Sequence, residues 1–129
     1  MQMASIRSVY NFSAGLEIVS GVGIIAIPKI SMDSLFSTSF SDPISAIARL
    51  YGFALFGLGI ACLEQHTDRL TVTHTRQGLC VYNITAALVL INAGAGGTAN
   101  TLLLIPAGIL HLILGIIMAI HLFKATYKS

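Results

Sequence analysis

Residues 43–63 read PISAIARLYGFALFGLGIACL, and this stretch decides the class of the fold. Arg49 is its only charged residue. The stretch is long enough to cross a bilayer, since about 20 helical residues span the hydrocarbon layer. Backbone N–H and C=O groups find no water inside a bilayer, so such a run is predicted to be a helix. The sequence holds four of these runs: Val9–Pro28, Pro43–Leu63, Gly78–Ala95 and Thr101–Phe123.

The composition excludes an ordinary soluble domain. Of the 129 residues, 55% are apolar and 9% are charged, whereas about 25% charged residues is usual in soluble proteins. This length leaves room for one domain. We therefore predict an all-α fold: residues 1–129 form a single integral membrane domain, a four-transmembrane-helix bundle in the lipid bilayer.

The placement of Lys and Arg predicts the orientation of the chain. Two cations, Lys29 and Arg49, fall at one side of an up-down-up-down bundle, and five fall at the other: Arg7, Arg69, Arg76, Lys124 and Lys128. The positive-inside rule then places both termini in the cytoplasm, with the protein multi-pass in the cell (inner) membrane. Cys62 and Cys80 lie near the same reducing side, so two free thiols are expected.

Pro28 is predicted to end the first helix, because proline cannot continue the hydrogen-bond ladder. Residues 29–42 follow as the longest connection. Two interpretations of this segment stay open, an interfacial half-helix lying on the bilayer and a packed polar loop. Both rest on apolar residues spaced between serines: Met32, Leu35, Phe36 and Phe40.

Gly94–Gly97 is predicted to form a tight turn, with Asn100 or Thr101 capping the last helix. Between the two halves of the sequence we find no repeat of convincing strength, which argues against the inverted-repeat signature of larger transporters.

Polar residues inside a bilayer are costly and usually face the interior of the bundle. Three ionisable residues fall well inside the apolar runs, away from their ends: Glu17, Arg49 and His111. At the helical rise per residue, Glu17 and His111 lie about 16 and about 15 Å from the outer ends of their helices, and Arg49 about 9 Å. We expect Glu17 to meet Arg49, with His111 as a third member and Asn83 contributing an amide. The same cluster can serve either to fix the order of the helices or to handle protons or a ligand.

Five glycines are predicted to let helices approach closely. They lie on the second and fourth apolar runs: Gly52, Gly57, Gly59, Gly108 and Gly115. They are expected to pack either within the chain or against other membrane subunits or a second copy.

Four residues around the connection between the second and third helices form a weak candidate metal site, Cys62, His66, His74 and Cys80. Their spacing matches no standard motif, so no metal and no cofactor are predicted. Catalytic residues are also not predicted: the sequence contains no nucleophile elbow, phosphate loop or carboxylate pair. With a net charge of +2 and no basic cluster, nucleic acid is not an expected partner.

Pro28, the run Ala48-Arg49-Leu50-Tyr51-Gly52 and the turn Gly94–Gly97 resemble the corresponding elements of a group of small bacterial four-helix membrane proteins. The resemblance covers most of the chain, rests on short motifs and implies a fold without an activity. The chain is also similar in architecture to small multidrug resistance transporters, which carry a membrane-embedded glutamate in their first helix, where Glu17 lies. It departs from them by its long first connection, by Arg49 and by the absence of tryptophan.

Two functions of different classes follow. The first is a non-enzymatic accessory or structural subunit that packs against other membrane helices. The second is a proton-coupled carrier of a small solute, or a binder of a small ligand, that uses Glu17, His111 and Arg49.

Overall fold

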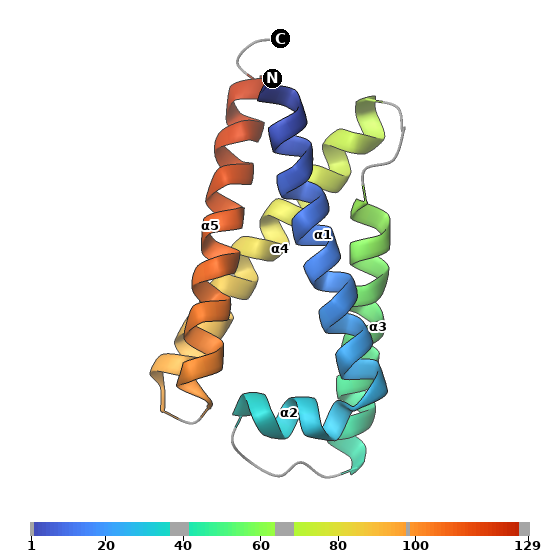
Figure 1. The fold of residues 1–129 in the computed structure, drawn as a ribbon, viewed down its shortest axis with the longest axis vertical. Coiled ribbons are helices and arrows are strands. Elements are labelled where there is room, and N and C mark those ends of the chain that lie inside the picture. Colours follow the sequence, from blue (N-terminus) through green and yellow to red (C-terminus); the bar gives the residue numbers. More distant parts are fainter. Residues whose placement is uncertain (1, 37–41, 64–68, 98, 127–129) are drawn as a thin grey trace.

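A computed structural model describes residues 2–36, 42–63, 69–97 and 99–126. The helices are α1 (Gln2–Ala26), α2 (Pro28–Phe36), α3 (Asp42–Cys62), α4 (Arg69–Ala95) and α5 (Thr101–Thr126) (Figure 1). These described ranges contain no strand, so the all-helical prediction is confirmed.

Four of the helices are long and apolar enough to cross a membrane, which is the signature of a multi-pass membrane protein. The crossing segments are Ile6–Ala26, Ile44–Cys62, Thr73–Ala95 and Thr101–Ala125. Two helices begin earlier than the sequence analysis predicted, α1 at Gln2 and α4 at Arg69. Hydropathy marks only the part of a helix that lipid can cover, whereas the backbone ladder continues into polar residues beyond it.

Pro28 does not simply end the first helix. α1 stops at Ala26, and α2 begins at Pro28 itself, a favourable first position because proline has no N–H to satisfy. Hydrogen bonds continue across the break, from the Ile27 N–H to the Gly23 carbonyl (3.0 Å) and from the Ser31 N–H to the Ile27 carbonyl (2.9 Å). The helical interpretation of this connection is therefore confirmed over Pro28–Phe36, while the rest of it, residues 37–41, lies outside the described residues.

The long helices form two pairs that meet each other sparsely. α1 packs along α3, and α4 packs along α5, whereas contacts between the pairs are few (Figure 1). The start of α1 and the end of α5 lie at one end of the molecule, which we call the terminal end. At the opposite end, the α2 end, α2 runs across from the first pair towards the second.

Both pairs use the same contacts. In the first pair, a Cβ built at Gly59 would lie 2.6 Å from Cγ1 of Ile18, and one at Gly52 would lie 3.0 Å from Cγ1 of Ile25. In the second pair, the corresponding distances are 2.8 Å from Gly115 to Ile84 and 2.6 Å from Gly108 to Ile91. Each pair therefore sets two glycines, seven residues apart, against two isoleucines with the same spacing, and is antiparallel. The halves thus repeat in their packing, although their sequences show no repeat of convincing strength.

These contacts also report on the predicted packing glycines. Gly52, Gly59, Gly108 and Gly115 all lie against a neighbouring helix of the same chain. Gly57 differs, because a Cβ added there would meet nothing within 4 Å. Close approach within the chain thus uses four of the five glycines.

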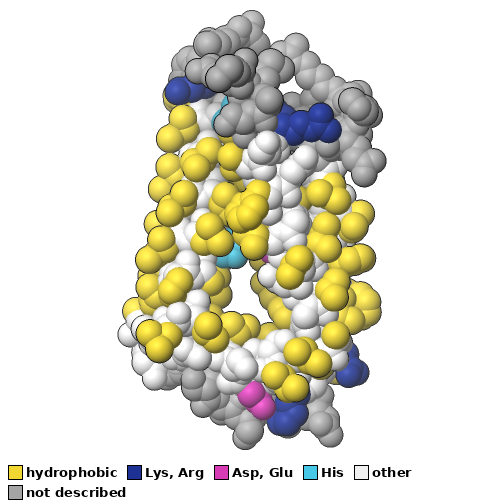
Figure 2. Space-filling model, viewed as in Figure 1, with side chains coloured by type: hydrophobic (Ala, Val, Ile, Leu, Met, Phe, Trp, Pro, Cys, Tyr) yellow, Lys and Arg dark blue, Asp and Glu magenta, His cyan; other side chains and the backbone are white. Residues whose placement is uncertain are grey.

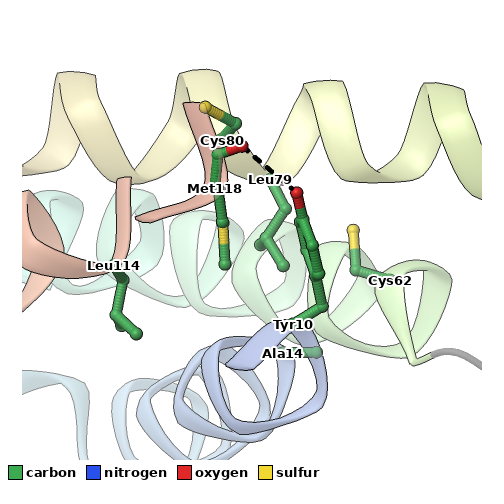
Figure 3. Close-up of a cluster of buried hydrophobic side chains, with 7 residues drawn as sticks. All are labelled: Tyr10, Ala14, Cys62, Leu79, Cys80, Leu114 and Met118. Atoms are coloured by element: carbon green, nitrogen blue, oxygen red, sulfur yellow. Dashed lines mark hydrogen bonds between the residues drawn. The ribbon is translucent and has the colours of Figure 1, made fainter. Parts of the chain in front are cut away.

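The terminal end is the place where all four long helices share one buried cluster. Its residues are Tyr10, Ala14, Cys62, Leu79, Cys80, Leu114 and Met118 (Figure 3). The Tyr10 hydroxyl points across the cluster to the Met118 carbonyl, at 3.5 Å. The guanidinium of Arg76 lies 5.0 Å from the centre of the Tyr10 ring, and the His121 ring meets the same ring edge-on at 6.0 Å. This end is closed by side chains from every long helix.

The α2 end is built differently. Figure 2 shows an opening through the molecule between the two helix pairs, on the α2 side of its middle. α2 borders this opening at the α2 end of the molecule. The last turn of α2 is hydrogen-bonded to Asn100. The backbone N–H of Asn100 donates to the Leu35 carbonyl (2.8 Å), and its amide Nδ2 donates to the Ser34 carbonyl (3.1 Å). α2 is thus a strap joining the two pairs.

Asn100 and Thr101 take different parts at the start of α5. The Asn100 carbonyl accepts the first helical bonds, from the N–H groups of Leu103 (3.1 Å) and Leu104 (2.9 Å). The Thr101 hydroxyl instead donates to the Gly94 carbonyl at 2.8 Å, in the last turn of α4. The turn between α4 and α5 includes Gly97, whose φ of 70° lies in the left-handed region that favours glycine.

Candidate functional site

A polar cluster joins the two helix pairs between the closed terminal end and the opening. Ser13 and Glu17 of α1 and Asn83 of α4 are buried, at 0%, 1% and 0% exposure. His111 of α5 completes the cluster and is partly exposed. These side chains are among the contacts that join one pair to the other, alongside the buried cluster at the terminal end.

Asn83 is the hub of the cluster, and its neighbours fix its orientation. The Leu79 carbonyl, 2.8 Å away, can only accept, so it must face the amide nitrogen Nδ2, which also donates to the Ser13 hydroxyl at 2.9 Å. The amide oxygen Oδ1 then faces Nδ1 of His111 at 2.9 Å. Because an amide oxygen can only accept, Nδ1 carries a hydrogen, and the lone pair of a neutral His111 is on Nε2.

Glu17 reaches the cluster from the other pair. Its Oε1 lies 3.9 Å from Nδ1 of His111, close enough for an ion pair with an imidazolium but too far for a hydrogen bond. Within the described part of the chain this buried oxygen has no hydrogen-bond partner. The carboxyl group lies near the hydroxyl of Tyr82, and Tyr82 lies near Tyr51 of α3. Glu17 thus presents an unsatisfied buried oxygen beside an imidazole.

The structure does not bring Arg49 to Glu17, which corrects the expected Glu–Arg pair. Arg49 is exposed, one turn beyond Gly52, whose own contact on α1 is Ile25. Glu17 lies next to Ile18, which meets Gly59 at the other end of the pair. The glycine contacts place Arg49 level with the last residues of α1, at the α2 end of the molecule. This is more than two helical turns along α1 from Glu17. Depths counted from the ends of apolar runs placed the two residues too close together.

The structure places Glu17, His111 and Asn83 near one another, together with two tyrosines that the sequence did not single out. Tyr82 was overlooked although it is adjacent to Asn83 and half-buried, and its ring also meets the His111 ring edge-on at 5.9 Å. The available signal was the rule that a buried tyrosine hydroxyl needs a partner. Tyr51 lies in the run Ala48-Arg49-Leu50-Tyr51-Gly52, from which only Arg49 was expected to join the polar cluster.

The weak candidate metal site is not assembled by the residues that the structure describes. Cys62 and Cys80 are buried free thiols, each directed at a helix carbonyl: Cys62 Sγ at Thr75 (3.7 Å) and Cys80 Sγ at Gly115 (3.6 Å). His74 is exposed on α4, and His66 lies outside the described residues. Over the described ranges no three His, Cys, Asp or Glu side chains are grouped so as to hold a metal ion.

Comparison of the chain with protein-family models, with curated proteins and with solved structures finds no match.

Proposed function

We propose that this protein is a proton-coupled carrier or binder of a small ligand, and that Glu17 and His111 form its site. The observation that carries the proposal is the buried Oε1 of Glu17, which has no hydrogen-bond partner among the described residues and faces an imidazole at 3.9 Å. A buried polar atom without a partner is costly, so such an atom is a natural acceptor for a proton or for a ligand's donor group.

The charge of the pair explains why a proton belongs to the mechanism. A protonated Glu17 beside a neutral His111 is neutral overall, and so is a carboxylate beside an imidazolium. Both arrangements avoid a net charge inside the membrane, which costs about 2.5–3.5 kcal/mol or more. Binding of a cationic or hydrogen-bond-donating group at Oε1 favours the carboxylate, so it is coupled to release of the proton.

The location of the pair supports a carrier. Glu17 and Asn83 occupy matching positions in the two halves. Glu17 immediately precedes Ile18, which meets Gly59, and Asn83 immediately precedes Ile84, which meets Gly115. Solute sites of many carriers lie at the interface between repeats, where one half can move against the other. The closed terminal end and the opening towards α2 would then give the site access from one side (Figures 2 and 3).

For the orientation we infer an up-down-up-down bundle in the cell membrane, with both termini in the cytoplasm. The support is the distribution of Lys and Arg, five at the terminal side against Lys29 and Arg49 at the α2 side. Cysteines introduced at Ala125 and at Ser34, both exposed, test it. An impermeant thiol reagent added outside intact cells should label Ser34→Cys and spare Ala125→Cys; the reverse pattern would refute the orientation.

An apolar carbodiimide tests the site, because it enters the bilayer and reacts with a protonated carboxyl group. We expect labelling at Glu17 that declines as the pH rises, and no labelling in Glu17→Gln. Small solutes that bind the site should protect Glu17, and in proteoliposomes they should dissipate an imposed pH gradient. Absence of Glu17 labelling at every pH would refute the proposal, since the carboxyl would then neither hold a proton nor be reachable.

An accessory subunit is the second candidate, and the open surface at Gly57 favours it. This glycine is exposed on α3 with nothing within 4 Å of an added Cβ, so a partner helix could approach there. Purification in mild detergent distinguishes the candidates. A larger membrane protein that co-purifies in fixed ratio, and is lost in Gly57→Leu, would favour the subunit.

A further inference from the structure

A surface depression of about 480 Å³ lies at the α2 end, away from the polar cluster. Residues 27–30, where α1 turns into α2, line one side, and Ser45, Ala46 and Arg49 from the first turns of α3 line the other. Pockets of this size are large enough for a small ligand or a headgroup.

The depression sits at the edge of the membrane-crossing region. The crossing segment of α1 ends at Ala26, and that of α3 begins at Ile44, so the lining residues straddle the boundary. Side chains at this level meet lipid headgroups, and the long stem of Arg49 can extend its guanidinium to them. The apolar walls, Ile27 and Ile30 among them, adjoin the acyl chains.

The charge of the depression is positive. Lys29 and Arg49 are the cations of its lining, and the space-filling view shows dark blue side chains at this end of the molecule (Figure 2). The Lys29 ammonium lies 3.5 Å from the Asp33 carboxylate one turn along α2, a surface pair with 55% and 33% exposure. Pairs this exposed are weak, so they yield readily to another anion. Arg49 forms no ion pair with a carboxylate of the described residues, although it lies within an apolar segment.

The geometry points to a binding site for the phosphate headgroup of an anionic phospholipid, held between Lys29 and Arg49. The guanidinium fork can donate two parallel hydrogen bonds to phosphate oxygens, and the ammonium adds a point charge. Ser45 brings a hydroxyl to the same depression. A bound lipid gives Arg49, which does not pair with Glu17, a role of its own. This site does not depend on the proton-coupled site.

Lipid retention by the purified full-length chain tests the site. The delipidated protein in detergent is incubated with phosphatidylglycerol or with phosphatidylcholine, and bound lipid is counted by native mass spectrometry. We expect phosphatidylglycerol to be preferred, and Lys29→Gln/Arg49→Gln to weaken its binding by roughly fivefold for each cation removed. The matched control, Arg7→Gln/Lys124→Gln, removes the same charge from the terminal end and should keep the preference.

Three outcomes would overturn the inference. The first is equal retention of the two lipids by the unaltered protein, and the second is an equal loss in the control variant. The third is full displacement of phosphatidylglycerol by inorganic phosphate, which would indicate a site for a free anion. If the double variant does not fold, Lys29→Gln alone, on an exposed helix face, should still lose roughly fivefold, and an unchanged preference there would contradict the site.

Discussion

The two helix pairs have the same scaffold and differ in what they add to it. In both, two glycines seven residues apart receive two isoleucines, so the backbones approach closely along the whole pair. The residue before Ile18 in the first pair is Glu17, and the residue before the matching Ile84 in the second pair is Asn83. The asparagine is fully hydrogen-bonded, whereas the glutamate keeps one oxygen without a partner among the described residues. The repeated glycine–isoleucine contacts therefore hold the two helices of each pair together. The candidate site arises because the matching positions carry different residues, a glutamate and an asparagine.

The connections within the pairs differ as well. α1 and α3 are separated by the strap α2, whereas α4 and α5 are joined by a short turn around Gly97. The strap reaches the other pair through its bonds to Asn100. The long connection therefore does more than link two helices, because it ties the pairs together at the end where the opening lies (Figures 1 and 2).

The largest expected effect comes from breaking the shared scaffold. Gly59→Leu and Gly115→Leu should each destabilise the protein by about 3 kcal/mol or more, since added atoms cannot be accommodated without separating the helices. Gly59→Leu should be worse, because a Cβ there already lies 2.6 Å from the Ala14 carbonyl oxygen, a backbone atom. At Gly115 the nearest atom is a side-chain atom, Cγ1 of Ile84 at 2.8 Å, and the nearest backbone atom is the Ile84 nitrogen at 3.2 Å.

The free energy of unfolding in mixed micelles measures both changes, and Gly57→Leu is the matched control. Nothing lies within 4 Å of a Cβ at Gly57, so this variant should fold normally. Equal stability of all three variants would show that the glycine contacts are incidental.

The next effect sharpens the contrast between the matching polar positions. Asn83→Ala should cost about 1–3 kcal/mol, because it leaves buried partners of a hydrogen-bonded amide unsatisfied. Glu17→Gln should cost less, since it keeps the shape of the side chain and removes a buried ionisable group. Thermal unfolding in the same detergent compares them. A larger loss in Glu17→Gln than in Asn83→Ala would reverse the roles that the structure gives to these residues.

The sequence was sufficient for the frame and for the centre of the site. Four long apolar runs predict spanning helices, and a glutamate and a histidine level with each other near the midplane were expected to face inward. It was not sufficient for Arg49, because the level of one helix against another is set by the glycine contacts and not by the ends of the runs. Tyr82 escaped notice for a related reason: its hydroxyl acquires partners only when α4 is placed beside α1 and α3.

The repeat in helix packing cannot be recognised from the sequence alone. Only the glycine and isoleucine positions and their spacing match, and α2 lengthens the first half relative to the second. The residues that carry the repeat are common in any membrane helix, so their correspondence becomes visible only once the contacts are known.

A smaller effect is expected at the strap. Asn100→Ala removes the bond from Nδ2 to the Ser34 carbonyl and keeps the backbone bond to Leu35, so it should cost about 0.5–1.5 kcal/mol at most. Amide hydrogen exchange should rise at the Asn100 position and along α2, with little change in α4. Asn92→Ala, an exposed polar residue on α4, is the control. Unchanged exchange in α2 would mean that the strap is held by contacts other than Asn100.

The central claim is that the charge states of Glu17 and His111 are coupled at the junction of the two pairs, and the carbonyl stretch of the Glu17 carboxyl group tests it most directly. Infrared difference spectra of the protein in lipid, recorded along a pH titration, should contain a protonated-carboxyl band that Glu17→Gln abolishes. In His111→Gln the band should titrate at a different pH, because the imidazole no longer exchanges its charge with the carboxyl. A Glu17 band that titrates identically with and without His111 would contradict the account.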